Sequence, residues 1–457
     1  MFTTPFKSSL FLRTLVAASL TVLFATGAAA KSITVPTVPA SACSKSITYL
    51  TTQYKNNADV RAALGAVADG MQDAPVAYPD GNPWQASKTS DELLAQMVTT
   101  FTKWCEFLPE INGVQDNGLY YIQVFSWFYY QNPAGQAFVQ GRNPLDPSKP
   151  LEVGRKFTKD FTNERGQYMW SAASKKHVAQ WVEDPRIEIT NYTKTTAAEF
   201  TSFNDFFSRD IIVDEASQTI PSRPATMPDL DYIVVSPTDC IMNPLVQVLK
   251  AGGTEQRQII NNPLQHNTVL DVKGIPISMD KLLGSAPATL KKHFDGGTGL
   301  SCVLMPNTYH HYHAPVNGTV KHAEVVKNNT YGYLDFPNFV PTSGNVGRPG
   351  TDFSQFEVFQ RGVVIIEVTY ADVNGKSKTG YVASIPVGLD TIGSVALDEG
   401  IVPGAELKRG FTRLGSFYYG GSLNILLFSK GLASAAVQTR LGNQINVLNI
   451  GVEPANP

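Results

Sequence analysis

The histidine-rich segment 309–318 (YHHYHAPVNG) is the first place where residue types and spacing could support chemistry. It gathers His310, His311 and His313, three of the chain's seven histidines, within a few positions. Imidazole groups transfer protons near neutral pH and also bind metals. A zinc site would need a further Cys, Asp or Glu at suitable spacing, and this segment contains none. We therefore expect no metal here and favour proton transfer, with histidines serving only a strand-and-turn surface as the alternative.

The segment 235–240 (VSPTDC) carries one carboxylate, that of Asp239. Here a predicted strand runs into a proline turn. An aspartate in a turn usually accepts hydrogen bonds from nearby backbone N–H groups. Asp239 therefore acquires a chemical role only if a histidine lies opposite it.

A serine preceded by two glycines lies in the segment 414–423 (LGSFYYGGSL). Glycines allow backbone conformations that side chains obstruct, so the Ser422 hydroxyl could approach the carbonyl of Gly421. The apolar run 425–428 predicts a strand directly afterwards. The alternative is an ordinary glycine turn that enters a strand.

Helices in the N-terminal part and strands in the C-terminal part must position these segments. Together they predict an α+β fold. With 457 residues, 43% of them hydrophobic, the chain has enough material for two domains. We expect a helical N-terminal domain over residues 31–195. Within it, the capping box 89–92 (TSDE) is followed by apolar residues at intervals of three and four, which predicts a helix.

A β-rich domain is expected over residues 200–457. Its short runs of β-branched and aromatic residues predict strands at 232–235, 363–370 and 381–385. The pair Asn374-Gly375 between the last two runs indicates a hairpin.

The aromatic stretch 119–130 (LYYIQVFSWFYY) has three interpretations. It could border a substrate channel, give peripheral contact with lipid around Trp127, or form a buried helix, and the buried helix is favoured. The segment 331–350, rich in proline and glycine, predicts a long loop.

The first thirty residues have the order of a cleavable secretory signal peptide. Lys7 and Arg13 precede the apolar run 15–25 and the small residues 28–30. We expect a mature chain that starts at Lys31 and is secreted or periplasmic. An uncleaved leader acting as an anchor is the alternative.

The charge composition limits which classes of molecule can be partners, and the cysteine content bears on the cellular compartment. Lys plus Arg total 37 against 39 Asp plus Glu, so nucleic acid is excluded as a partner because positive charge is not in excess. The four cysteines allow one or two disulfides in an oxidising compartment. We favour Cys43 with Cys105, since Cys240 and Cys302 fall beside candidate site residues.

Several separated motifs, taken in order, resemble the phosphatidylserine decarboxylase family over roughly residues 200–452. A further N-terminal region also occurs in relatives that decarboxylate free aromatic amino acids, including fungal tryptophan decarboxylases. The motifs are FNDFFSR at 203–209, RP at 223–224, SPTD at 236–239, YHHYHAPVNG at 309–318, PVG at 386–388, IGS at 392–394 and GGS at 420–422.

This resemblance implies a zymogen that cuts itself between Gly421 and Ser422. In the family, the serine attacks the preceding carbonyl, and β-elimination of the resulting ester leaves a pyruvoyl group, the covalent cofactor. The large chain and the small chain 422–457 would stay associated. By position, His313 is the general base on Ser422, and Asp239 orients and charges its imidazole.

The implied reaction is decarboxylation, for which the pyruvoyl ketone supplies what pyridoxal phosphate supplies elsewhere. His310 matches a second family histidine that positions the substrate carboxylate or returns a proton to the α-carbon. The chain departs from the family pattern at Cys240, which replaces Gly, at Leu423, which replaces Thr or Ser, and at Phe359-Gln360, which replace Asn-Glu before Arg361.

Three functions follow from these observations. The first is conversion of phosphatidylserine to phosphatidylethanolamine and carbon dioxide in phospholipid biosynthesis. The second is decarboxylation of a free, aromatic L-amino acid. The third, kept open by Leu423 and Cys240, is a non-catalytic binding protein whose Ser422 is never converted.

Overall fold

The computed structural model describes fourteen stretches of the chain. By its contacts, the chain from Val35 to Pro457 forms one unit that includes both the helical and the β-rich regions. The described residues are 33–71, 84, 89–108, 125–129, 132–244, 246–251, 254–259, 269–272, 275–327, 331, 359–372, 374–389, 394–418 and 421–433.

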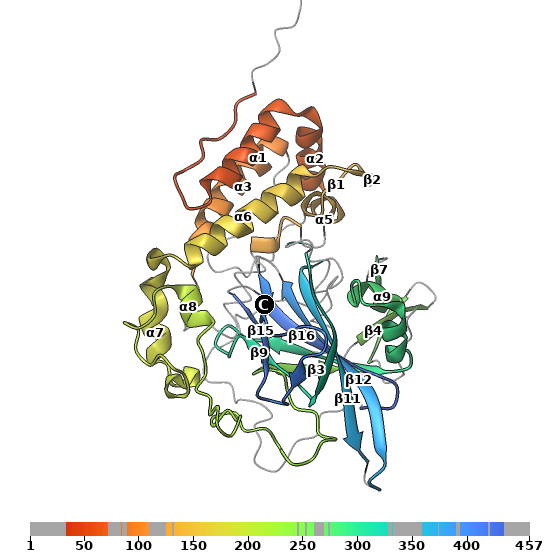
Figure 1. Cartoon of the computed structure of the whole chain (residues 1–457). Helices are drawn as coiled ribbons and strands as arrows, with labels where there is room; N and C mark the ends of the chain where they lie inside the picture. Colours follow the sequence, from red (N-terminus) through yellow and green to blue (C-terminus); the bar gives the residue numbers. More distant parts are fainter. Residues whose placement is uncertain are drawn as a thin grey trace, which may run out of the picture. The chain divides into compact units, whose positions relative to one another are not determined.

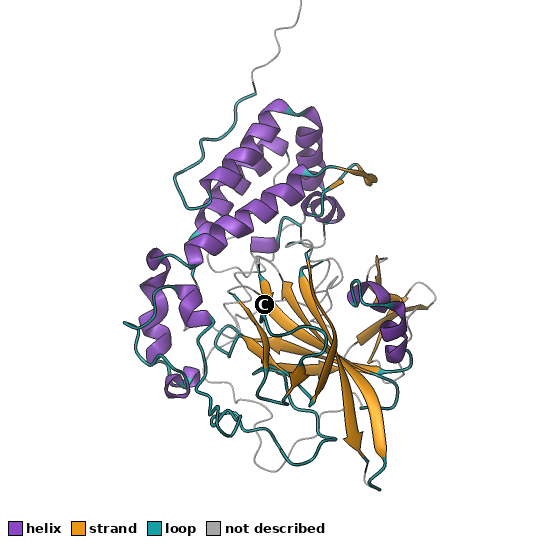
Figure 2. Ribbon diagram, viewed as in Figure 1, coloured by secondary structure: helices purple, strands orange, loops and turns teal. Residues whose placement is uncertain are grey.

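α-Helices build the described part of the helical region (Figures 1 and 2). Thr89 caps α3 by accepting a hydrogen bond from the Glu92 backbone N–H (3.2 Å), which confirms the helix predicted from the capping box. The helices are α1 (Ser44–Asn56), α2 (Ala58–Asp69), α3 (Ser90–Cys105), α5 (Pro133–Val139) and α6 (Val153–Met169).

Aromatic side chains make the centre of this region. The Phe101 ring on α3 has its centroid 4.8–5.8 Å from four other rings. These rings belong to Phe125, Phe128, Phe157 and Phe161. A disulfide between Cys43, just before α1, and Cys105, the last residue of α3, confirms the favoured pairing.

The aromatic stretch 119–130 is described only at residues 125–129, and these five side chains are buried. Trp127 is 6% exposed and Phe128 is fully buried. This burial agrees with the favoured interpretation of a buried segment, since these rings pack inside the protein rather than against lipid.

Short helices connect this region to the strands. They are η2 (Ala172–His177), α7 (Val178–Glu183), η3 (Pro185–Ile187), η4 (Ile189–Asn191) and α8 (Phe203–Phe207). Small two-stranded sheets are formed by β1 (Arg142–Asn143) with β2 (Asp146–Pro150), β4 (Val246–Ala251) with β5 (Thr254–Ile259), and β6 (Val269–Val272) with β7 (Ile275–Ser278).

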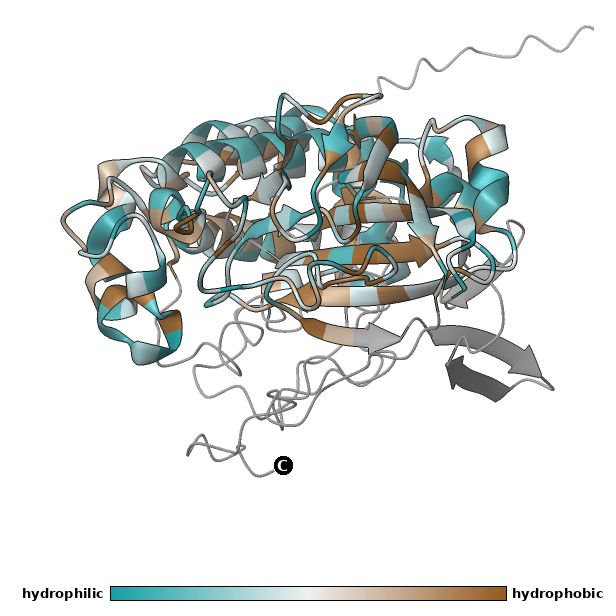
Figure 3. Ribbon diagram, turned by 60° about the horizontal axis from the view of Figure 1, so that its bottom comes forward, coloured by the Kyte–Doolittle hydropathy of each residue, from teal (hydrophilic) through white to brown (hydrophobic). Residues whose placement is uncertain are grey.

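A seven-stranded antiparallel sheet dominates the β-rich region, in the order β14-β10-β11-β12-β16-β8-β3. In Figure 3, hydrophobic residues colour much of the length of these strands. The strands are β3 (Ile241–Pro244), β8 (Thr298–Leu304), β10 (Gly318–Val326), β11 (Arg361–Ala371), β12 (Ser377–Leu389), β14 (Glu406–Leu407) and β16 (Gly421–Phe428). The short helices α9 (Met279–Leu282), α10 (Ala288–Lys291) and η5 (Lys292–Phe294) precede β8.

A second sheet has three strands in the order β13-β15-β9, with bounds Val395–Leu397, Arg413–Phe417 and His311–His313. One buried cluster joins the two sheets, since it contains Tyr312 and Phe417 from the small sheet and Leu304 and Leu426 from the large one. His311 and His313 therefore lie in a strand that packs on the large sheet, and His310 directly precedes this strand.

The structure confirms two predicted strands and the hairpin, and it corrects a third strand. Strands β11 and β12 contain 363–370 and 381–385, and Gly375 in the turn between them has φ +73°. Residues 232–235 form no strand. Arg409 binds the carbonyls of Leu230 (2.7 Å) and Ile233 (2.8 Å), so the segment is held by a side chain rather than by a ladder. The predicted loop 331–350 lies outside the described residues except for Tyr331.

Candidate active site

Ser422 lies at the start of β16, between β12 and β8 in the interior of the large sheet. It pairs with Gly388 on one side and Leu304 on the other. Its side chain is 3% exposed, and the Oγ atom has no hydrogen-bond partner in the described part of the chain. Burying an unpaired hydroxyl costs free energy, so such a group indicates a functional position.

The side chain of Ser422 faces the small sheet. Alternate residues of a strand point to the same face, so Ser422 shares its face with Leu426 and with its neighbour Leu304. Both leucines belong to the cluster that contains Tyr312 and Phe417. The serine and the histidine segment therefore approach the same interior.

His313, on β9, is a neutral imidazole with a defined tautomer. Its Nδ1 lies 2.8 Å from the carbonyl oxygen of Phe411, which can only accept, so Nδ1 carries the proton. Its Nε2 is therefore the basic nitrogen and accepts a hydrogen bond from the Tyr309 hydroxyl (3.0 Å). Burial lowers the pKa of His313 to about 4. At neutral pH this side chain can accept a proton at Nε2.

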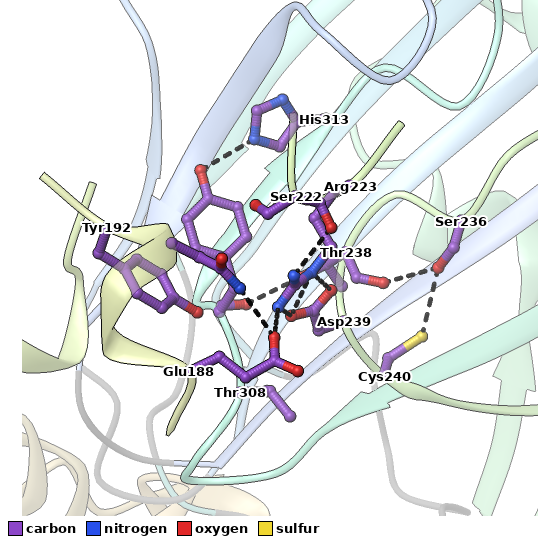
Figure 4. Close-up of polar contacts among 12 residues, drawn as sticks. Glu188, Tyr192, Ser222, Arg223, Ser236, Thr238, Asp239, Cys240, Thr308 and His313 are labelled. Carbon is purple, nitrogen blue, oxygen red and sulfur yellow. Dashed lines mark hydrogen bonds and ion pairs between the residues drawn. The ribbon is translucent and has the colours of Figure 1, made fainter. Parts of the chain in front are cut away.

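Asp239 is paired with Arg223 rather than with His313 (Figure 4). The guanidinium donates from Nε to Oδ1 (3.0 Å) and from Nη2 to Oδ2 (3.0 Å), and it also pairs with Glu188 (3.0 Å). The structure thus lacks the direct contact through which Asp239 was expected to orient His313. Two charge-assisted hydrogen bonds from Arg223 satisfy the carboxylate. The Nδ1–H of His313 donates to the Phe411 carbonyl instead.

The turn that carries Asp239 is nevertheless tied to the histidine segment by two hydrogen bonds. The backbone N–H of His313 donates to the Pro237 carbonyl (2.7 Å), and the Thr238 hydroxyl donates to the Tyr309 carbonyl (2.9 Å). The structure therefore brings the two segments together, and the negative charge of Asp239 acts on His313 without contact.

His310 is held between an aromatic ring and a carbonyl. Its ring centroid lies 3.7 Å from that of Phe207, and its Nδ1 donates to the carbonyl of Thr308 (2.9 Å). Burial, followed by the positive charge of Arg209, keeps the pKa of His310 well below its usual value. Among the described residues, no hydrogen bond reaches Nε2 of this imidazole.

The backbone links His310 to the strand that leads toward Ser422. The Phe417 N–H donates to the His310 carbonyl (2.9 Å) at the end of β15. His311 lies on the same strand pair, but its Nε2 donates to the Ser208 carbonyl (3.0 Å), which is a structural contact. The four predicted residues thus lie on three segments of the β-rich region: the turn of Asp239, the histidine segment with His310 and His313, and β16 with Ser422.

Comparisons with known proteins decide the family. A family model described as phosphatidylserine decarboxylase matches residues 203–447, more than half of the chain. The chain belongs to the phosphatidylserine decarboxylase family. It is accordingly a carboxy-lyase, as its motifs implied.

Individual relatives are distant but cover much of the chain. A phosphatidylserine decarboxylase proenzyme of Clostridium perfringens is 25% identical over 341 residues, 73% of this chain and 92% of the relative. One of Fusobacterium nucleatum is 24% identical over 306 residues, 66% and 80% respectively. Decarboxylase iboD of Amanita muscaria is 26% identical over 238 residues, 50% of this chain and 58% of the relative.

The sequence alone gave no role to Tyr309 of this phosphatidylserine decarboxylase family member. Its ring is buried (4% exposed), and its hydroxyl donates to Nε2 of His313. It lies in the histidine motif, but spacing along one strand gives no signal of where its hydroxyl points.

In the sequence, Arg209 and Arg223 are noted only as members of the family motifs FNDFFSR and RP, with no role of their own. Arg223 proves to be the partner of Asp239. The guanidinium of Arg209 is buried between the rings of Tyr192 (4.4 Å) and Phe206 (4.9 Å). It donates to the carbonyl of Asn307 (3.0 Å), directly before the histidine segment, so it supports the backbone there.

The described residues contain no group of three His, Cys, Asp or Glu side chains placed to hold a metal ion. No helix within the described ranges is long and apolar enough to cross a membrane. The expected cofactor, a pyruvoyl group made from a serine, is compatible with what is present. Ser422 follows Gly421 directly and has a buried, unpaired hydroxyl.

Proposed function

We propose that the chain cleaves itself between Gly421 and Ser422 and that Ser422 becomes the pyruvoyl terminus of the small chain. The observation that carries this proposal is the buried, unpaired Oγ of Ser422, at the position where the family's motif order has its reactive serine.

In the proposed cleavage, His313 accepts the Ser422 hydroxyl proton at Nε2 while Oγ attacks the Gly421 carbonyl carbon. The C–N bond breaks and leaves an ester and a free amine. Loss of the Ser422 α-proton then expels the Gly421 carboxylate. The remaining dehydroalanyl group takes up water and loses ammonia to give the ketone.

The Tyr309 hydroxyl occupies the Nε2 position of His313 in this structure. Proton transfer therefore requires this hydroxyl either to move aside or to pass on its own proton while it accepts that of Ser422. The small chain should remain bound after cleavage, because β16 is hydrogen-bonded to both β12 and β8.

For the decarboxylation, the pyruvoyl carbonyl would bind the substrate amine and delocalise the charge left when carbon dioxide departs. His310 is the residue we assign to the proton returned to the α-carbon. Its Nδ1–H donates to Thr308, which fixes the ring and leaves the Nε2 lone pair available. The Phe207 ring packs against the imidazole, with the ring centroids 3.7 Å apart.

Phosphatidylserine is the first candidate substrate, with phosphatidylethanolamine and carbon dioxide as products. It is supported by the family and by relatives named as phosphatidylserine decarboxylase proenzymes. Peripheral contact with lipid would be made by exposed apolar side chains between residues 212 and 241. These are Ile212, Val213, Met227, Tyr232, Val234 and Ile241.

A free L-amino acid is the second candidate substrate. It is favoured by the burial of residues 125–129, because a buried Trp127 does not offer the lipid contact that was one interpretation of this stretch. One relative is named only as a decarboxylase. Processed protein should be incubated separately with phosphatidylserine vesicles and with a panel of amino acids, and the carbon dioxide measured. Carbon dioxide release from only phosphatidylserine or only amino acids would reject the other substrate class.

A non-catalytic binding protein is disfavoured by the position of Leu423. Successive side chains of a strand point to opposite faces, so residue 423 faces away from Ser422 and packs between Val303 and Val387. A hydroxyl at this position would not reach the side of the sheet on which Ser422 lies.

We also propose that the chain is exported and loses residues 1–30. The support is the order of charged, apolar and small residues in the leader, together with two disulfides, which persist in oxidising compartments. N-terminal sequencing of protein from the native host tests this. A mature chain beginning at Met1 contradicts it.

A further inference from the structure

The disulfide between Cys240 and Cys302 lies inside the candidate active site. Cys240 directly follows Asp239, and Cys302 lies on β8 with the two Cα atoms 5.4 Å apart. Cys302 pairs with Asn424, two residues after Ser422 on β16. One covalent bond therefore connects the turn of the candidate acid to the strand beside the candidate nucleophile.

The turn has few other attachments to the large sheet. It enters β3, an edge strand of four residues, and Ile241 at the start of β3 is 38% exposed. Short edge strands contribute few hydrogen bonds and separate readily. The hydrogen bonds of Thr238 and Pro237 run to the histidine segment instead.

Cys302 and Ser422 face the same side of the sheet. The residues paired across β8 and β16 share a face, and Cys302 lies opposite Asn424 while Leu304 lies opposite Ser422. The disulfide therefore bridges from this interior face to the Asp239–Arg223 pair. The hydroxyl of Ser236 lies within 4.0 Å of both sulfur atoms and donates to the Thr238 carbonyl (2.7 Å), which closes the turn on the disulfide.

We propose that the Cys240–Cys302 disulfide is a positioning device for the active site, required for efficient self-cleavage and turnover. This inference rests on the proposed function of Ser422. The disulfide fixes the distance between the Asp239 turn and β8, so the histidine segment bound to that turn keeps its place opposite β16. When it is reduced, β3 can separate from β8 and the segment is no longer held.

The two sulfur atoms differ in access, which sets how reduction proceeds. Cys302 is fully buried, whereas Cys240 is half-buried. A dithiol reductant attacks the sulfur of Cys240 and releases the Cys302 thiolate. Its second thiol then displaces Cys240, which gives two protein thiols and one oxidised reductant.

The chain contains a matched control. The disulfide between Cys43 and Cys105 also spans 62 residues, but it joins α1 to α3, within the helical region. Because both close loops of equal length, chain entropy predicts a similar stabilising contribution from each. A purely structural role for Cys240–Cys302 would make the two disulfides equivalent.

The experiment compares Cys240→Ala/Cys302→Ala with Cys43→Ala/Cys105→Ala in the full chain. The melting temperature and the rate at which the small chain appears by mass are measured from pH 4 to 8. We expect similar losses of melting temperature. Self-cleavage should slow at least tenfold, with an altered pH profile, only in the variant without Cys240–Cys302. Equal cleavage rates and pH profiles in the two variants would overturn the inference.

A second measurement covers the case in which the double variant fails to fold. Folded, processed wild-type protein is treated with increasing reductant, and labelling of Cys240 by a thiol reagent is followed by mass. Turnover should fall in proportion to this labelling, and full turnover at complete labelling would overturn the inference. Absence of cleavage in the wild type would instead refute the proposed function.

Discussion

The helical region and the β-rich region differ in the titratable groups that they bury, because buried histidines among the described residues occur only in the β-rich region. In the helical region, the buried Arg165 guanidinium donates to the carbonyls of Trp104 and Phe107 (both 3.1 Å), and the Asn132 amide donates to Val67 (2.8 Å) and Phe128 (3.0 Å). In the β-rich region, burial instead lowers the pKa values of three histidines.

The difference indicates where chemistry can occur. Hydrogen bonds to carbonyls in the helical region hold packed elements together and leave those groups unreactive. Near β9 and β16, burial leaves the Ser422 hydroxyl without a partner among the described residues, and the buried histidines keep basic nitrogens. Such groups are costly for stability, so their retention fits a catalytic role.

Replacing the candidate nucleophile should have the largest effect. Ser422→Ala should remain a single chain with no detectable decarboxylase activity, because no hydroxyl is available to attack Gly421. Mass analysis of the purified protein measures this. Ser416→Ala is the matched control, since Ser416 also follows a glycine, is also buried in a strand and should allow cleavage. Two chains in the Ser422→Ala protein would show that another residue is the nucleophile.

Replacing the base should be nearly as severe. His313→Ala should slow cleavage by about 10²–10⁴-fold, the usual contribution of a general base. In the wild type, the imidazole must be neutral to accept a proton, and burial lowers its pKa to about 4. The cleavage rate should therefore stay constant from pH 8 down to about pH 6 and fall as the pH approaches 4. A midpoint near pH 6.5 would contradict the buried, neutral state.

The hydroxyl of Tyr309 should have an intermediate effect. Because it donates to the Nε2 lone pair, it stabilises neutral His313, so Tyr309→Phe should raise the pKa of that imidazole. The midpoint of the cleavage profile should then move to higher pH. Tyr312→Phe is the control, because that hydroxyl donates to the Ala396 carbonyl (2.6 Å). An identical profile in both variants would remove Tyr309 from the account.

A core change in the helical region should have the smallest effect on cleavage. Phe101→Leu should lower the free energy of unfolding by about 1–3 kcal/mol, because it leaves a void among four rings. Denaturant unfolding measures this loss. The cleavage rate of the folded fraction should match the wild type, and a large decrease would mean that the helical region takes part in the chemistry.

Local signals allowed some of this fold to be predicted from the sequence. Helix α3 follows from the Thr89 cap and its apolar spacing, and the β11–β12 hairpin follows from Asn374-Gly375. The strand predicted at 232–235 was wrong because Arg409, more than 170 residues away in sequence, binds the carbonyls of Leu230 and Ile233. No local pattern reports such a contact.

Contacts between distant segments also explain which parts of the site could be predicted from the sequence and which could not. Motifs placed Asp239, His310, His313 and Ser422 in one region, but the pairing of Asp239 with Arg223 depends on how distant turns meet. The Cys240–Cys302 disulfide likewise depends on the register of β3 against β8. Side-chain partners are properties of packing, and a single sequence does not contain them explicitly.

The most direct test of the central claim is mass analysis of the mature protein with and without borohydride. We expect two chains that meet at Gly421 and Ser422, with a small chain whose terminus carries a ketone and gains mass on reduction. A decarboxylating protein that remains one unbroken chain, or a small chain that begins with an ordinary serine amine, would contradict the account.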